Sequence, residues 1–98
     1  MSVYAVEYVY EPGSEEGRSE NRADHRALLD SLTDIENVKL VASGPYTDGS
    51  GALLLFAAAT EEKLRDVLAQ DPFNRLGFVK NLRVTEWEPV TGELSQYA

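Results

Sequence analysis

The stretch that decides the fold is VKLVASGPYTDGSGALLLFAA, residues 38–58. Its two ends, residues 38–43 and 52–58, are short apolar runs rich in residues that favour β-structure. Between them, residues 44–51 hold three glycines, a proline and an Asp-Gly pair, a density that is typical of a hairpin connection. The centre of the chain is therefore predicted to be two antiparallel strands joined by a compact turn.

On the N-terminal side of this hairpin, the sequence predicts a strand and then a helix. Residues 3–10 alternate with a period of two, and both faces of the strand are mostly apolar. Residues 11–17 hold a proline, two glycines and three glutamates without periodicity, which indicates a loop. From about Arg18 the period becomes helical, and the helix should end near Leu32 or Asp34.

The apolar stripe of this helix carries the only histidine of the chain, because His25, Leu28, Leu29 and Leu32 are spaced as i, i+3, i+4 and i+7. Ser19 and Asn21 are both possible N-caps. Either cap would place His25 in the first turns, where the positive end of the helix dipole favours a neutral imidazole.

On the C-terminal side, the hairpin is followed by a second helix and a last strand. Thr60 is expected to cap this helix, and Pro72 is expected to end it. Residues 73–77 are predicted to be a short connector, residues 79–87 a strand, and residues 90–98 a tail that frays or docks on a partner.

The order βαββαβ is that of a ferredoxin-like α+β fold, with a four-stranded antiparallel sheet and both helices on one face. A chain of 98 residues can bury one core, so residues 1–98 are expected to form a single domain. In this topology the start of the first helix, the hairpin and the end of the second helix share one edge. We therefore expect His25, Asp48 and Asp71 to lie on that edge.

Composition narrows the class of partner. The chain has 17 acidic and 9 basic residues and a formal net charge of -8, which argues against nucleic acid and anionic membranes. No signal peptide and no long apolar run are evident, so a soluble cytoplasmic protein is expected. With no cysteine, one histidine and no glycine-rich loop opening a helix, we expect no metal and no cofactor.

Four motifs occur in order along the chain: Arg22-x-x-His25, Gly44-Pro45 followed by Asp48, Asp71-Pro72-Phe73 followed by Gly77, and residues 84–87 near the end. Together they resemble the YciI-like (YCII-related) family. The resemblance implies a dimeric α+β barrel, in which two ferredoxin-like subunits pack sheet against sheet. It also implies a cleft near a His/Asp pair suggested to do acid/base chemistry, here His25 and Asp71. Most of the family has no assigned reaction, although one member is a dehydrochlorinase acting on a hydroxylated chloroaromatic, and related barrels include muconolactone isomerases.

The residues themselves also favour such a pair. Histidine exchanges protons near neutral pH. Asp71 is expected at the C-terminal end of a helix, where an anion is disfavoured by roughly 0.3–1 kcal/mol and needs a compensating cation or imidazole N–H. If Asp71 accepts from one ring nitrogen of His25, it fixes the tautomer and leaves the other nitrogen for a substrate proton.

Each of these residues also has a structural explanation. A histidine on an apolar helix face can be a hydrogen-bonded core or interface residue, and Asp71 before proline can be a backbone cap. Asp48 before glycine fits an ordinary hairpin turn, and Ser43 can bond its own loop. Arg22 is either a solvated side chain, an anchor for an anionic substrate group or a partner for Asp71.

Taken together, the sequence predicts a homodimer that acts on a small ring-bearing or carboxylated metabolite as a cofactor-independent isomerase or lyase. His25 would move the proton and Asp71 would orient it. The ligand would be held by Arg22, Ser43, Gly44, Asp48 and Phe73. The alternatives are a non-catalytic module that binds a small molecule or assists a larger enzyme, and a structural domain with an empty cleft.

Overall fold

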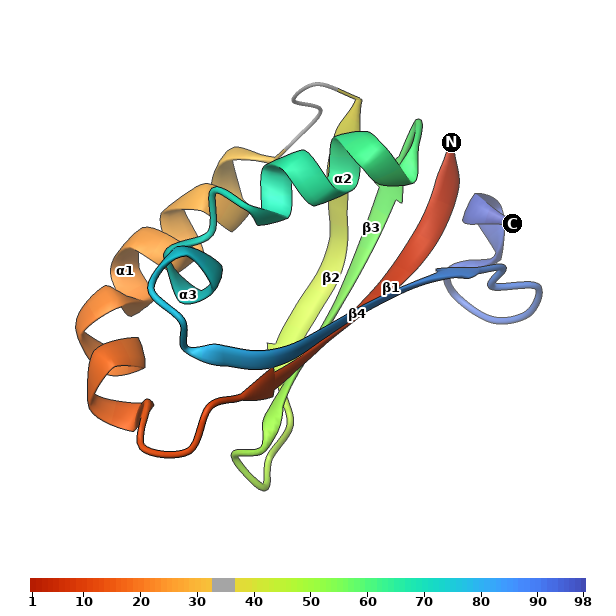
Figure 1. Ribbon diagram of the computed structural model, residues 1–98. Coiled ribbons are helices and arrows are strands. Elements are labelled where there is room, and N and C mark those ends of the chain that lie inside the picture. Colours follow the sequence, from red (N-terminus) through yellow and green to blue (C-terminus); the bar gives the residue numbers. More distant parts are fainter. Residues whose placement is uncertain (33–36) are drawn as a thin grey trace.

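The fold is seen in a computed structural model that describes residues 1–32 and 37–98 (Figure 1). The elements are β1 (Ser2–Tyr10), α1 (Glu15–Ser31), β2 (Val38–Pro45), β3 (Gly51–Ala58), α2 (Glu61–Leu68), α3 (Pro72–Arg75), β4 (Val79–Trp87) and a final 3₁₀ helix, Ser95–Tyr97. The four strands form one sheet in the order β2-β3-β1-β4, and every neighbouring pair is antiparallel. Helices α1, α2 and α3 lie on one face of it (Figure 1). The predicted ferredoxin-like α+β fold is confirmed.

The core lies between this sheet and the helices. Alternate residues of the central strand β1 face the helices, and the β3 residues paired with them in the register face the same way. Thr60 caps α2 as predicted, because its side chain accepts a hydrogen bond from the Lys63 amide at 3.1 Å. The largest fully buried hydrophobic side chains of the core are Tyr8, Phe56, Leu54, Leu64, Val6 and Val38.

Helix α1 begins one turn earlier than the sequence predicted. Its N-cap is Ser14, so the predictions of Ser19 and Asn21 as caps are wrong. The glycine at position 17 permits this early start, since a Cβ there would overlap the ring of Phe78.

The early start moves His25 away from the helix end, because it is the eleventh of 17 residues. The expectation that the positive helix end favours a neutral His25 is therefore wrong, because that effect fades beyond the first turn. At its other end α1 stops at Ser31, and Asp34 lies outside the described residues.

Helix α3 replaces the connector predicted for residues 73–77. Asp71 is its N-cap, and the Asp71 carboxylate accepts from the Phe73 amide at 3.0 Å, while Pro72 occupies the first turn. The carboxylate thus lies at a helix N-terminus, where free N–H groups favour an anion. The prediction that it lies at an unfavourable C-terminal end is wrong, since α2 stops at Leu68.

A β-bulge in β2 sets which residues of that strand face the helices. The register of β2 against β3 shifts between Leu40 and Ala42. Before the shift Leu40 pairs with Phe56, and after it Ser43 pairs with Leu54, so both face the helices. Without the extra residue Ser43 would point to the opposite face, because strand side chains alternate.

The sheet face away from the helices is partly covered by the end of the chain. Val3 and Ala57 on this face are buried, and Tyr97 of the final 3₁₀ helix borders the same shallow hollow as Val3. Further along the face, Val9 and Trp87 are 44% and 41% exposed. No helix among the described residues is long and apolar enough to cross a membrane.

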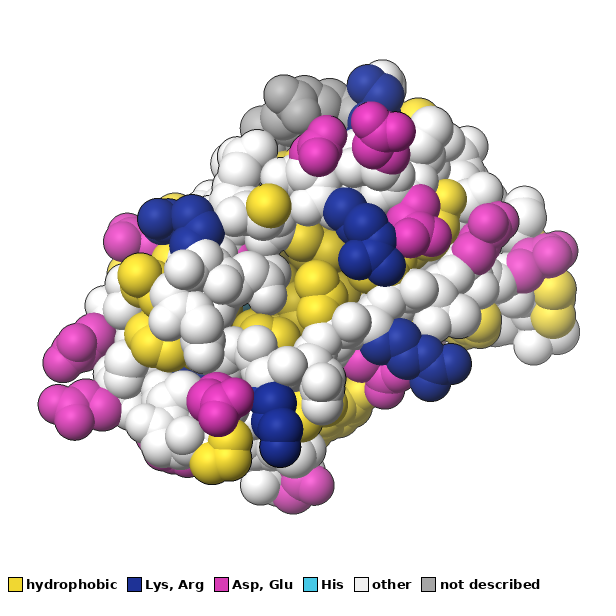
Figure 2. Space-filling view, viewed as in Figure 1, with side chains coloured by type: hydrophobic (Ala, Val, Ile, Leu, Met, Phe, Trp, Pro, Cys, Tyr) yellow, Lys and Arg dark blue, Asp and Glu magenta, His cyan; other side chains and the backbone are white. Residues whose placement is uncertain are grey.

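The face of the molecule shown in Figure 2 carries many acidic side chains around its outline. Figure 2 also shows hydrophobic side chains in a hollow between α2 and β4. Strand β4 is an edge strand, and its Leu82 is 37% exposed.

Candidate functional site

A cavity of about 410 Å³ lies between α1 and the helix-facing side of β1, β2 and β3. One face of α1 forms its wall, with Arg18, Arg22, His25, Arg26 and Leu29. The β2 strand and the hairpin turn line it with Ser43, Gly44, Pro45 and Gly49. Tyr10, Ala52, Leu54 and Phe73 complete the lining.

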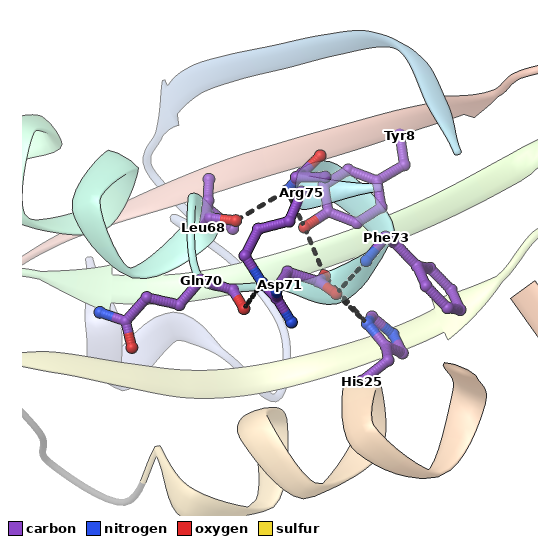
Figure 3. A network of polar contacts seen from close by, with 8 residues as sticks. Tyr8, His25, Leu68, Gln70, Asp71, Phe73 and Arg75 are labelled. Carbon is purple, nitrogen blue, oxygen red and sulfur yellow. Dashed lines mark hydrogen bonds and ion pairs between the residues drawn. The ribbon is translucent and has the colours of Figure 1, made fainter. Parts of the chain in front are cut away.

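The polar centre of this site is the contact between His25 and Asp71. Nδ1 of His25 lies 2.9 Å from each carboxylate oxygen of Asp71, although the residues are 46 positions apart. Asp71 is 1% exposed. Figure 3 shows the imidazole reaching from α1 toward the carboxylate at the start of α3.

Two other donors fix the Asp71 carboxylate. The Tyr8 hydroxyl donates to Oδ2 at 2.9 Å, and the Phe73 amide donates to Oδ1. The Asn74 amide in turn donates to the Tyr8 hydroxyl at 2.9 Å and to the Leu68 carbonyl at 2.8 Å. With donors from β1, α1 and α3, the carboxylate has little freedom to rotate.

Tyr8 stays a hydrogen-bond donor in this network. Burial is the main cause that raises the pKa of its hydroxyl far above the usual value of 10.0, and the neighbouring charge of Asp71 raises it further. The hydroxyl is therefore protonated at any pH at which the protein would work.

The second ring nitrogen of His25, Nε2, is open. Hydrogen bonds within the described chain engage only Nδ1 of this ring, and no buried polar side-chain atom there lacks a partner. Nε2 is therefore accessible to solvent. The imidazole stacks on Phe73 with ring centroids 4.1 Å apart and planes inclined by 3°. This stacking and the Asp71 contact hold the ring in one orientation.

The electrostatics of the cavity differ from those of the chain as a whole. Three arginines line it, and none of the described residues in its lining is Asp or Glu. Their influence is seen on Tyr10: burial raises the pKa of its hydroxyl, while the charges of Arg18 and Arg22 act to lower it.

The structure brings together most of the residues that the sequence singled out. His25, Arg22, Ser43, Gly44 and Phe73 line one cavity, with Asp71 directly behind His25. Their catalytic and binding roles stay predictions.

Asp48 is not among the cavity residues. Its carboxylate accepts from the Ser50 amide at 2.9 Å within the hairpin turn. The Ser50 side chain first, and then this amide, lower the pKa of Asp48. The structural explanation of this residue fits its position better than a ligand contact does.

Sequence reasoning missed four residues of the site: Tyr8, Asn74, Arg18 and Arg26. The two arginines precede and follow Arg22 by four positions, so helical spacing places them on the same face. That signal was available, whereas nothing in the pattern marks Tyr8 as different from the other core tyrosines. Across residues 1–32 and 37–98, no group of three or more His, Cys, Asp or Glu side chains could hold a metal ion.

The fold and site define a class of protein: a small ferredoxin-like α+β domain with a buried aspartate holding a histidine at the wall of a cavity. The chain belongs to the family described as the YCII-related domain, whose model matches residues 2–88. The resemblance seen in the sequence motifs is thereby confirmed. No curated protein sequence matches the chain.

Solved structures with the same fold include 5-chloro-2-hydroxyhydroquinone dehydrochlorinase from Burkholderia phenoliruptrix, in complex with 2,5-dihydroxybenzoquinone. It is 24% identical, with a TM-score of 0.76 over 87% of this chain and 92% of that one. A candidate antibiotic biosynthesis monooxygenase from Bacteroides thetaiotaomicron is 17% identical, with a TM-score of 0.64 over 95% and 92% of the two chains. An Agrobacterium tumefaciens protein is 12% identical, with a TM-score of 0.62 over 97% of each chain. At these identities the likeness shows the fold.

Proposed function

We propose that this protein is a cofactor-independent acid/base catalyst, an isomerase or lyase acting on a small ring-bearing or carboxylated compound. The observation that carries the proposal is that the two ring nitrogens of His25 have different surroundings. Nδ1 is held by the buried Asp71 carboxylate, and Nε2 is accessible at the wall of a cavity. A base needs a fixed ring with one free nitrogen, which this arrangement supplies.

The chemistry follows from the tautomer. Nδ1–H donates to the Asp71 carboxylate, so Nε2 carries the lone pair and can accept a proton from a bound C–H or O–H. The carboxylate then stabilises the imidazolium that forms. In an elimination the leaving group departs with its bonding electrons and the proton stays on Nε2, so the substrate loses HX. In an isomerisation the same proton returns to another atom of the substrate.

Of the two reactions, elimination is supported by a solved structure of the same fold. The solved dehydrochlorinase of the same fold is an enzyme whose name states the loss of HCl. Because it is 24% identical to this chain, it suggests a first reaction to assay and leaves the substrate open.

The test uses the whole protein with chlorinated hydroxyhydroquinones and ring carboxylates in deuterated buffer. Chloride release and deuterium incorporation into the ligand are measured for the parent, His25→Ala and Asp71→Asn. We expect loss of a positioned general base to slow turnover by about 10²–10⁴-fold in His25→Ala. Asp71→Asn should slow turnover as well, because an amide can present its N–H to Nδ1 and turn the tautomer around.

Lys63→Gln serves as the control, because this exposed residue of α2 lies outside the cavity. A folded His25→Ala variant that turns over or exchanges as fast as the parent would rule out the catalytic role.

A non-catalytic binding module is the second candidate function. Asp71 also caps α3 and accepts from Tyr8, so the fold itself needs this carboxylate whether or not a reaction occurs. Ligand binding to the parent without chloride release or deuterium exchange would favour this candidate.

We also propose that the protein is a homodimer that packs sheet against sheet. Val9 and Trp87 are exposed on the face away from the helices, next to the half-buried Leu53 and Leu55. Sedimentation should show a dimer at micromolar concentration. Leu55→Lys should weaken that dimer, while Leu82→Lys on the helix side of β4 should leave it unchanged. A parent protein that stays monomeric would contradict the proposal.

A further inference from the structure

The cavity has an arginine row that the proton-transfer chemistry does not use. Arg18, Arg22 and Arg26 are spaced by four residues along α1, and all three line the cavity beside His25. Arg22 and Arg26 are exposed, as surface arginines usually are. Arg18 is 9% exposed, which is rare for a charged side chain without a close ionic partner.

Arg18 is held in place by contacts with Ser14 and Tyr10. Its Nε donates to the Ser14 hydroxyl at 3.0 Å, and its guanidinium lies 3.8 Å from the ring centroid of Tyr10. Its nearest carboxylate oxygen belongs to Glu15, at 4.0 Å, and that side chain is 75% exposed. A contact this long to a mobile surface group does little to neutralise the charge.

The charge of the row contrasts with the rest of the molecule. The chain carries a net charge of -8, yet the lining formed by residues 1–32 and 37–98 contains three arginines and no carboxylate. The Asp71 carboxylate lies behind the imidazole and is committed to His25, Tyr8 and the Phe73 amide. A concave site of one sign with low-dielectric walls concentrates ions of the opposite sign.

From these observations we propose that the arginine row is a subsite for the carboxylate of a ring-bearing substrate, with Arg18 as its fixed point. This inference deepens the proposed function and rests on it for the identity of the ligand as a substrate. A guanidinium whose Nε is already bonded can still offer its terminal N–H groups to both oxygens of a carboxylate. Arg22 and Arg26 close over the anion from the solvent side.

The spacing along α1 bounds the size of that ligand. Arg18 and His25 are seven residues apart, which at 1.5 Å per residue is about 10 Å along the helix axis. Both side chains line one cavity of about 410 Å³, which suits a single ring with short substituents. The ligand would place its carboxylate at Arg18 and its reacting atom at Nε2 of His25, with its ring against Leu29 and Leu54.

A structural role for Arg18 is the competing explanation. Its bond to Ser14, the N-cap residue, and its contact with Tyr10 tie the first turn of α1 to the sheet. That role predicts a change in stability when Arg18 is replaced, but no preference for anionic ligands.

The experiment compares binding of benzoate with that of its neutral isostere benzamide by titration calorimetry, using the whole protein at two salt concentrations. A charge-assisted hydrogen bond corresponds to a preference for benzoate of about tenfold or more. We expect Arg18→Gln to remove most of this preference while changing benzamide affinity less than about twofold, and added salt to weaken benzoate alone.

Arg65→Gln is the matched control, because Arg65 is an exposed arginine of α2 that pairs with Glu61 outside the cavity. Its benzoate preference should equal that of the parent. If Arg18→Gln fails to fold, the double variant Arg22→Gln/Arg26→Gln changes only exposed residues and should still lower the preference.

Two results would overturn the subsite: equal affinity of the parent for benzoate and benzamide, or a folded Arg18→Gln variant that keeps the full preference. The experiments distinguish a failure of the subsite proposal from a failure of the proposed reaction. His25→Ala should keep the benzoate preference, so a preference that persists while the parent shows no turnover would reject the reaction and retain the subsite.

Discussion

Replacing Tyr8 with phenylalanine tests whether the hydrogen-bond network behind His25 contributes to the stability of the fold. The Tyr8 side chain is fully buried, and its hydroxyl donates to Asp71 Oδ2 and accepts from Asn74. Phenylalanine keeps the ring and its packing, so Tyr8→Phe removes these two hydrogen bonds with little other change.

The expected cost follows from the two bonds. A hydrogen bond to an ionised carboxylate contributes about 1.5–3 kcal/mol and one between neutral groups about 0.5–1.5 kcal/mol. Asp71 keeps His25 and the Phe73 amide as donors, and Asn74 keeps the Leu68 carbonyl, so neither is left unsatisfied. We therefore expect the lower end of the sum, a loss of about 2 kcal/mol in the free energy of unfolding. For a domain of this size that lowers Tm by roughly 8–16 °C.

Urea unfolding of the parent and of Tyr8→Phe measures this loss, and Tyr4→Phe is the control. Tyr4 lies four residues earlier on the same face of β1 and is 6% exposed. Among the described residues, the hydroxyl of Tyr8 makes side-chain hydrogen bonds and that of Tyr4 makes none. Its replacement should cost less than about 0.5 kcal/mol, within the usual range for a change that breaks no such feature.

Equal effects of Tyr8→Phe and Tyr4→Phe would refute the reasoning. A double-mutant cycle with Asp71→Asn adds a second criterion, because residues in one network show interaction free energies of about 0.5–3 kcal/mol. Additive losses would mean that the bond between Tyr8 and Asp71 contributes nothing specific.

Three further outcomes are expected. Stability should fall as pH rises above about 10, because the unfolded chain then loses the Tyr8 proton while burial keeps it bound in the folded state; spectrophotometric titration and unfolding curves should show a shallower fall in Tyr8→Phe. Gly51→Ala should cost more than about 3 kcal/mol or prevent folding in urea experiments, since its Cβ would overlap the Tyr8 carbonyl oxygen, whereas Gly44→Ala meets nothing within 4 Å and should be tolerated. Thr60→Ala should lower the unfolding free energy by about 1 kcal/mol in thermal or urea unfolding, because the Lys63 amide loses its cap.

The fold could be predicted because its main signals are local. Alternation in residues 3–10, the turn residues at 44–51 and the cap at Thr60 each specify one element without reference to the rest of the chain. Because crossover connections between parallel strands are almost always right-handed, few topologies can join these elements. The same reasoning put His25 and Asp71 on one edge, and the structure has them 2.9 Å apart.

The start of α1 could not be predicted because it depends on a tertiary contact. Residues 15–17 are Glu-Glu-Gly, which show no apolar period, and a glycine there is usually a sign of a loop. What makes this turn helical is the ring of Phe78, which lies where any larger side chain at position 17 would be. Sequence spacing cannot show a contact between residues 61 positions apart.

The Asp71-Pro72 pair was misinterpreted because it carries two opposite signals. A proline ends the helix before it and is also favoured in the first turn of the helix after it. The sequence does not say which effect dominates, and here both do: α2 stops at Leu68 and α3 starts at Pro72.

For Ser43 and Arg18, the sequence could not predict the surroundings of the side chain. Strict alternation from Val38 places Ser43 on the outer face, and one bulge residue reverses this. Arg18 looks like any solvated arginine at the start of a helix until Ser14 and Tyr10 are seen around it. The bulge that decides the direction of Ser43 leaves no periodic signal. Helical spacing indicates the face on which Arg18 lies, but it does not show that Arg18 is buried.

Most contacts of Asp71 and His25 are explained by the fold, whereas the accessible Nε2 of His25 is not. Every hydrogen bond that Asp71 accepts is explained by folding: it caps α3, ties β1 to α3 through Tyr8 and anchors α1 through His25. His25 makes one of these bonds with Nδ1, and packing against Phe73 accounts for the position of its ring. A purely structural histidine would have no need of an accessible Nε2 in a cavity lined by three arginines. The accessible nitrogen and its basic surroundings are therefore the features that folding alone leaves unexplained, and they are where ligand chemistry should be sought first.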